Sequence, residues 1–162
     1  MFSICGRRTD KSTSSGTTIY AYDDNTVGTT NQSGGILSRF AQSQNIDEPL
    51  AMDRSSVASF YEADGLGSVT SLSNSAGALA ETYTRDSFGK QTGSTGSLTN
   101  PFQYTARESD VETGLYYYRA RYYDPNTGRA RNRKASRSSG SRREGRRYTF
   151  SAMVFACRNR SK

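Results

Sequence analysis

Apolar and aromatic residues of this 162-residue chain occur in short stretches separated by clusters of Gly, Asn, Asp and Ser. From Thr18 to about Arg129 this alternation is typical of β-strands that are bounded by turns. The best helix candidate, Ser75–Tyr83, contains Gly77 and residues that favour strands, both of which argue against a helix. The pattern therefore predicts an all-β region built from antiparallel hairpins.

Two turn segments repeat at an offset of 43 residues. The segment NQSGGI begins at Asn31 and precedes Phe40, and NSAGAL begins at Asn74 and precedes Tyr83. The glycine at the fourth position of each segment can adopt a positive φ and close a hairpin without steric cost. We therefore expect Phe40 and Tyr83 on the returning strands of two equivalent hairpins.

A tighter repeat, D-x-x-T-G, occurs at Asp110–Gly114 and at Asp124–Gly128. It fits a turn in which the Asp side chain caps the backbone and the glycine takes the left-handed conformation, with Pro125 fixing φ in the second copy. The stretch between the two turns, Leu115–Tyr123, is predicted to be one strand.

Alternation along a single strand would give Leu115–Tyr123 two different faces. An apolar face would carry Tyr116, Tyr118, Ala120 and Tyr122, and a cationic face would carry Tyr117, Arg119, Arg121 and Tyr123. The cationic face has two interpretations. It is either a packed interior face or the glycan- or peptide-binding surface of a module at the cell surface.

The run GLYYYRARYYDPNTGR from Gly114 to Arg129 resembles the core motif of RHS-repeat-associated proteins, the bacterial relatives of YD-repeat proteins. Asp64–Val69 and Tyr83–Gly89 are also typical of the approach to that core, so the resemblance covers residues 18–129. One departure is Ala106, where the family usually has Gly. The resemblance assigns structural roles to Asp110, Gly114, Tyr116, Tyr117, Tyr118, Arg119, Arg121, Tyr122, Tyr123, Asp124, Pro125 and Gly128.

The resemblance implies a fold and a function. YD repeats form hairpins that wind side by side into a spiralling sheet, and the sheet closes into a hollow shell around a cargo. In bacteria that cargo is often a toxin domain at the C-terminus. The implied function is structural, the implied partners are other RHS-repeat segments or a toxin cargo, and the implied location is secreted or associated with the cell envelope, although the first residues contain no apolar signal segment.

The sequence departs from the family after Arg129. Relatives continue with another strand and with Asp-Pro segments that resemble an aspartyl self-cleavage site, but here no Asp follows Asp124 and no Pro follows Pro125. A dyad needs two neighbouring acids, so we expect no self-cleavage. A shifted reading frame or a degenerate gene end is our hypothesis for this change. The expected regions are a flexible lead-in (1–17), an RHS-like β region (18–129) and a tail (130–162).

Charge separates the tail from the body. Residues 129–162 hold 12 Lys and Arg and one acid, whereas residues 1–128 hold 10 Lys and Arg against 14 Asp and Glu. The tail has too few apolar residues to offset its ordering entropy, so we expect disorder. Its cations suggest an alternative function, nonspecific binding of nucleic acid or another polyanion. The candidate residues are Arg131, Arg133, Lys134, Arg142, Arg143, Arg146 and Arg147.

Catalytic and metal chemistry have little support in the sequence. The chain has no His, and its two cysteines, Cys5 and Cys157, lie near opposite ends, which favours free thiols. The glycines of Gly65–Gly67 and Gly93–Gly96 suit turns better than phosphate loops, and the scattered aspartates suit turn caps better than calcium ligands. No apolar run is long enough to cross a membrane. We expect neither enzyme activity nor a cofactor.

Overall fold

The computed structural model describes residues 7–23 and 25–132. These residues form two antiparallel sheets and one 3-10 turn, η1 (Tyr104–Ala106). The nine-stranded sheet contains β1 (Asp10–Thr13), β2 (Gly16–Asp23), β3 (Asn25–Asn31), β4 (Ile36–Gln42), β5 (Pro49–Arg54), β6 (Val57–Ala63), β7 (Val69–Asn74), β8 (Leu79–Arg85) and β9 (Gln91–Gly96). The four-stranded sheet contains β10 (Glu108–Asp110), β11 (Leu115–Tyr118), β12 (Arg121–Asp124) and β13 (Arg129–Asn132). The predicted all-β fold of antiparallel hairpins is confirmed.

One turn geometry recurs along the larger sheet. The side-chain oxygen of Asn74 accepts hydrogen bonds from the backbone N–H groups of residues 76 and 78, at 2.9 and 3.0 Å, and Gly77 has a φ of 79°. Asp64 and Asp86 cap their turns in the same way, and Asn31 caps the equivalent turn three residues before Gly34. The 43-residue repeat is therefore a real structural repeat, and an Asn or Asp followed three residues later by Gly marks each of these turns.

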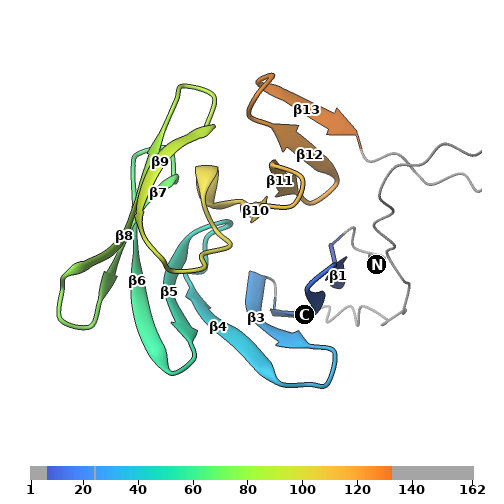
Figure 1. Cartoon of the computed structure of the whole chain (residues 1–162), viewed down its shortest axis with the longest axis vertical. Helices are drawn as coiled ribbons and strands as arrows, with labels where there is room; N and C mark the ends of the chain where they lie inside the picture. The colour runs from blue at the N-terminus through green and yellow to red at the C-terminus, as the bar shows by residue number, and fades with distance from the viewer. Residues whose placement is uncertain (1–6, 24, 133–162) are drawn as a thin grey trace, which may run out of the picture.

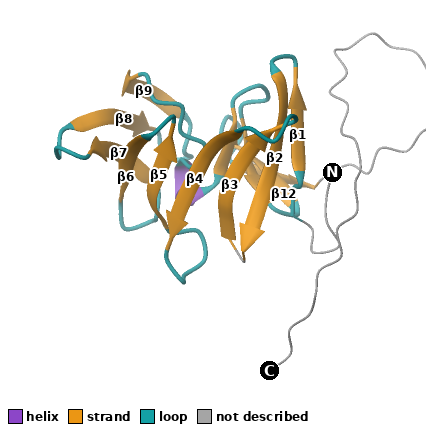
Figure 2. Cartoon of the chain, turned by 90° about the horizontal axis from the view of Figure 1, so that it is seen from below, coloured by secondary structure: helices purple, strands orange, loops and turns teal. Residues whose placement is uncertain are grey.

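The nine strands lie in sequence order, each antiparallel to the next, and the sheet curves into an open shell (Figure 1). After β9 the chain leaves the sheet, and residues 97–107 cross its concave side. The four-stranded sheet then lies across the mouth of the curve, near β1 and β2 at one end (Figure 2). Meandering hairpins of this kind bury one face and leave the other to solvent.

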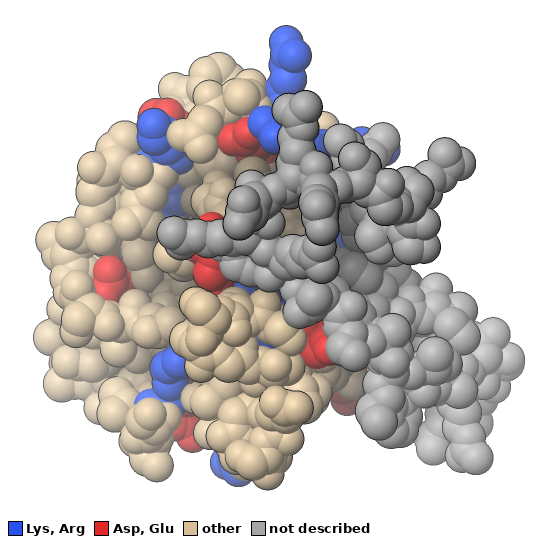
Figure 3. Space-filling model, turned by 45° about the vertical axis from the view of Figure 1, so that its right-hand side comes forward, with Lys and Arg blue, Asp and Glu red and all other residues tan. Residues whose placement is uncertain are grey.

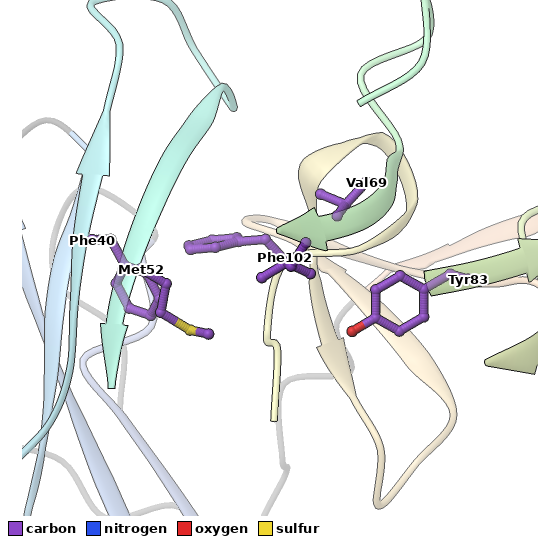
Figure 4. Close-up of a cluster of buried hydrophobic side chains, with 6 residues drawn as sticks. Phe40, Met52, Val69, Tyr83 and Phe102 are labelled. Atoms are coloured by element: carbon purple, nitrogen blue, oxygen red, sulfur yellow. The ribbon is translucent and has the colours of Figure 1, made fainter. Parts of the chain in front are cut away.

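The core lies on the concave face of the larger sheet, where Phe102 from the crossing segment packs between β4 and β5 on one side and β7 and β8 on the other (Figure 4). Its ring meets the ring of Phe40 edge-on, with centroids 5.0 Å apart. Phe40 and Tyr83, the two aromatic residues of the sequence repeat, both lie in this cluster. The other buried members are Met52, Val69 and Leu72.

Two expected region boundaries are wrong. The sequence predicts a flexible lead-in over residues 1–17, yet β1 begins at Asp10, and Arg8 is 1% exposed. The sequence predicts a tail from residue 130 onward, yet β13 extends to Asn132 and pairs with β12. Both segments are too polar to signal a strand on their own, and backbone pairing with a neighbouring strand orders them. The rest of the tail and both cysteines lie outside the described residues. Residues 7–23 and 25–132 contain no helical segment with the length and hydrophobicity needed to span a lipid bilayer.

Candidate functional site

The D-x-x-T-G segments are both tight turns, as predicted, and their glycines have positive φ, 68° at Gly114 and 64° at Gly128. In the second turn a carboxylate oxygen of Asp124 accepts a hydrogen bond from the N–H of Asn126 at 3.0 Å. In the first turn the backbone oxygen of Asp110 accepts from Gly114 at 2.8 Å, while its carboxylate binds cations elsewhere. Side-chain capping therefore holds for Asp124, and Asp110 has another role.

The predicted strand Leu115–Tyr123 is wrong, because the chain reverses within it. Strands β11 and β12 form a hairpin through Arg119 and Ala120, and Arg119 has a φ of 55°. The pairing sets Tyr116 opposite Tyr123 and Tyr117 opposite Tyr122, so cross-strand tyrosine pairs replace the expected alternation.

The proposed cationic face therefore does not exist as one surface. Tyr117 is 4% exposed and packs inward, while Tyr123 pairs with Tyr104 and Tyr116 on the other face of the hairpin. A glycan-binding surface built from this set of residues loses its basis, and of the four residues only Tyr117 is buried, while Arg121 is exposed.

The first junction between the two sheets is a buried ionic cluster around Arg8. One guanidinium nitrogen donates to both carboxylate oxygens of Asp110, at 2.8 and 2.7 Å, and the other nitrogen binds Glu108. Lys11 adds ion pairs to Asp110 at 3.1 Å and to Glu112 at 2.8 Å. The cluster joins the beginning of the described chain to a strand about 100 residues later.

Two tyrosines complete the surroundings of Arg8. The centre of its guanidinium lies 4.8 Å from the ring centroid of Tyr20 and 4.5 Å from that of Tyr117, which are cation–π distances. Burial alone would lower the pKa of Arg8, but Glu108, Tyr20 and Asp110 raise it well above its ordinary value, so the group stays charged. Burial has the opposite effect on Tyr117, whose pKa it raises to about 12. The cluster is therefore a desolvated ionic contact built around a charged guanidinium.

A second junction fixes the loop between β4 and β5. The carboxylate of Asp47 binds Arg107 at 2.5 Å and Arg119 at 3.4 Å. Arg107 ends the crossing segment and Arg119 belongs to the β11–β12 turn, so one acid ties both to the larger sheet. On the face that Figure 3 shows, acidic and basic side chains of the described residues are interspersed.

The third junction lies at the turn between β8 and β9. The hydroxyl of Tyr116 donates to the carbonyl oxygen of Gly89 at 2.9 Å, and that of Tyr123 donates to the carbonyl oxygen of Phe88 at 2.8 Å. A Cβ on Gly89 would overlap the ring of Tyr104, so the turn lies directly against this aromatic cluster. The four-stranded sheet is thus fixed to both ends of the larger sheet.

A cavity of about 770 Å³ lies between strands β1–β4 and the crossing segment. Its walls are rich in hydroxyl and amide side chains, with a few apolar and charged groups. Lining residues include Thr18, Thr29, Asn31, Ser38, Phe40, Arg54, Asn100, Phe102 and Glu112. Such walls can hydrogen-bond to a polypeptide. Within residues 7–23 and 25–132, no group of three or more His, Cys, Asp or Glu is placed to hold a metal.

The remaining sequence candidates fall into two groups. Arg131 lies on β13, and its guanidinium donates to Asp124 at 2.6 Å, while the other proposed polyanion-binding residues lie outside the described part of the chain. Asp64 and Asp86 are turn caps, as expected, and Gly93 and Gly96 lie in β9.

Sequence reasoning missed Arg8, Lys11 and Glu108, because charged residues in polar surroundings give no local signal of a partner far along the chain.

No protein-family model matches the chain. The tRNA3(Ser)-specific nuclease WapA of Bacillus spizizenii is 28% identical over 129 residues, which cover 76% of this chain and 6% of that protein. The tRNA(Glu)-specific nuclease WapA of Bacillus subtilis subsp. natto is 38% identical over 72 residues, 43% of this chain and 3% of that protein. The chain thus spans a small part of these curated relatives.

Solved structures show the same fold. A crystal structure of TcdB2-TccC3-TEV has a TM-score of 0.61 and 19% identity, over 80% of this chain and 7% of that chain. A structure of the Photorhabdus luminescens Tc holotoxin pore has the same TM-score and identity, over 83% of this chain and 7% of that chain. The fold is thus of the RHS type, and these likenesses agree with the resemblance of the sequence motif to RHS/YD-repeat proteins.

Proposed function

We propose that this chain is a wall segment of an RHS shell that encloses a toxin cargo. The observation that carries the proposal is the arrangement of the two sheets: the smaller one spans the mouth of the larger one and is fixed to it at three junctions. The concave side is thereby held as an inner surface. The likeness to the WapA tRNA nucleases and to the Tc holotoxin pore supports the assignment of a toxin cargo, and the chain corresponds to a small part of their length.

The experiment is a graft into a relative. Residues 7–132 replace the matching segment of the Bacillus spizizenii WapA protein. The fraction of the grafted WapA protein that stays intact is then measured during limited trypsin digestion. A second graft carries Phe102→Asp, which places a charge in the buried cluster on the concave face. We expect the unmodified graft to resist trypsin as the parent does and the Phe102→Asp graft to be cut faster. Equal, rapid cutting of both soluble grafts would contradict the proposal.

We also propose that the segment itself is not an enzyme. The absence of His from the sequence and the turn-capping roles of Asp64 and Asp86 support this. The matched curated relatives are named tRNA nucleases, so the sharp test is incubation of the purified full chain with tRNA. We expect no cleavage of the tRNA, and no cut within the chain itself between about pH 4 and 8, because no pair of neighbouring carboxylates is expected to share a proton. Cleavage that a single Asp→Asn substitution abolishes would contradict it.

A further inference from the structure

A small cavity lies beside Asp47, at the junction that fixes the loop between β4 and β5. Its volume is about 40 Å³. A water molecule needs roughly 10–15 Å³ of such space, so the cavity has room for about three, or for a group of similar size such as a carboxylate. Its wall brings together three arginines, Arg7 before β1, Arg107 at the end of the crossing segment and Arg119 in the β11–β12 turn.

The charged groups of this wall are not balanced. The wall contains two acids, Asp47 and Glu108, against the three arginines, and Glu108 is already bound by Arg8. The carboxylate of Asp47 is shared by two of the arginines, and its distance of 3.4 Å to Arg119 exceeds the usual length of a hydrogen bond. Arg7 forms no ion pair within residues 7–23 and 25–132. The wall therefore carries more positive than negative charge.

Aromatic rings hold two of these guanidinium groups in place. The centre of the Arg7 guanidinium lies 5.4 Å from the ring centroid of Tyr22, and that of Arg107 lies 4.9 Å from the ring centroid of Tyr118. The ring of Tyr22 is itself fixed, because its hydroxyl donates to the carbonyl oxygen of Arg8 at 2.7 Å. A guanidinium that lies over a ring keeps the N–H groups at its edge for an acceptor. The donors are thus positioned before any ligand arrives, which lowers the cost of binding.

We propose that this cavity binds a carboxylate group through Arg7 and Arg119, while Asp47 keeps Arg107 in place. A guanidinium offers its N–H donors in a planar fork that matches the two oxygens of a carboxylate. The side chain of Arg119 is 39% exposed, so this part of the wall is accessible to solvent. The carboxylate belongs either to an acidic side chain of a polypeptide or to a small free acid. This inference does not rest on the proposed shell function.

The test is saturation-transfer NMR of the full chain with acetate, at constant ionic strength set with chloride. The signal of the acetate methyl group should rise to saturation as acetate is added. Arg7→Gln and Arg119→Gln should each weaken binding at least about tenfold, because each removes charged hydrogen bonds to the ligand. A tripeptide Gly-Glu-Gly with both ends blocked, compared with Gly-Gln-Gly, distinguishes the two sources. Binding of the Glu peptide indicates an acidic side chain, and binding of acetate alone indicates a small free acid.

Arg121→Gln is the matched control, since it removes the same charge from an exposed position on β12 that does not line the cavity. It should bind acetate like the unmodified chain, and all variants keep the same basic residues 133–162. Arg119→Gln decides the outcome if Arg7→Gln does not fold, because the Arg119 side chain is partly exposed. The proposal is overturned if the unmodified chain gives no saturable acetate signal, if Arg119→Gln binds as well as the unmodified chain, or if Arg121→Gln loses as much binding as Arg119→Gln.

Discussion

The buried guanidinium of Arg8 joins the two sheets of a chain that has few hydrophobic residues. Only 33% of the residues are hydrophobic, so apolar burial supplies limited stabilisation for this length. Arg8 is 1% exposed and binds Glu108 and Asp110, which are themselves buried. A buried ion pair adds little compared with an apolar core, but removing one partner leaves an uncompensated charge.

Arg8→Met should therefore destabilise the chain strongly, by about 3–5 kcal/mol, because two buried carboxylates lose their main partner. Lys11→Met removes a more accessible cation from the same cluster and should cost less than about 1 kcal/mol. Urea denaturation followed by circular dichroism measures both losses. Equal, small losses for the two variants would show that the cluster is not the joint between the sheets.

Ala106 occupies a backbone conformation that suits glycine. Its φ is 52°, it is buried, and it ends η1 just before Arg107. The left-handed region costs an L-residue about 1–2 kcal/mol compared with glycine. This cost explains why glycine is usual at this position in the family that the sequence resembles. In this chain the backbone of Ala106 is therefore strained.

Ala106→Gly should raise the free energy of unfolding by about 1 kcal/mol, because it relieves this strain. The matched change Ala58→Gly lies in the extended strand β6 and should lower the free energy of unfolding by about 0.5–1 kcal/mol. Thermal melts of the two variants measure the opposite shifts. A loss of stability in Ala106→Gly would show that the methyl group packs usefully despite its φ.

At the scale of elements, the turns rather than the strands determine where the hairpins form along the chain. The strands are short and polar, yet Asn31, Asp64, Asn74 and Asp86 each cap a turn whose glycine lies three residues later. Repetition of this local device sets the hairpins in order along the larger sheet. One of these turns, at Gly89, also touches the aromatic cluster of the smaller sheet.

Comparing Gly77→Ala with Gly89→Ala separates two roles of these turn glycines. One role is to adopt a positive φ, and the other, at Gly89 alone, is to leave room for Tyr104 beside the smaller sheet. Both glycines have a φ near 80°, 81° and 79°, but a Cβ on Gly77 meets open space, whereas one on Gly89 overlaps Tyr104. Gly77→Ala should cost about 1–2 kcal/mol from the backbone alone. Gly89→Ala should cost about 1–3 kcal/mol more through overpacking. Equal losses in urea denaturation would mean that this turn does not support the smaller sheet.

At the scale of the molecule, the charge is divided between two regions. Residues 1–128 carry more acids than bases, while residues 129–162 carry 12 Lys and Arg against one acid. Acidic and basic groups are interspersed on the face of the described body in Figure 3, and many of them are paired across the junctions. Any affinity for polyanions should therefore reside in the tail.

Binding of the full chain to RNA should be weak, indifferent to sequence and steeply salt-dependent, because each neutralised phosphate releases counterions. A chain ending at residue 132 should lose this binding and keep the β fold, since β13 ends at Asn132. Filter binding across a salt series measures both expectations. Equal affinity of the two chains would place the binding in the body, and a salt-insensitive preference for one sequence would indicate a specific nucleic-acid function.

The fold class, the turns and the family resemblance can be recognised from the sequence, because these depend on local chemistry. Asp or Asn caps, left-handed glycines and the tyrosine-rich run all act within a few residues of one another. Even so, the reversal at Arg119 escaped prediction, because neither Arg119 nor Ala120 is a typical turn residue.

Which distant residues meet depends on how the two sheets assemble in three dimensions. Arg8 meets Asp110, Asp47 meets Arg107, and Gly89 meets Tyr104, each pair joined by the curvature of the larger sheet and by the inward course of residues 97–107. Ionic and aromatic contacts of this kind leave no periodic pattern in the sequence. Burial gives these contacts their strength. Because burial is a property of the assembled sheets and not of any one segment, the contacts cannot be predicted from one stretch of sequence.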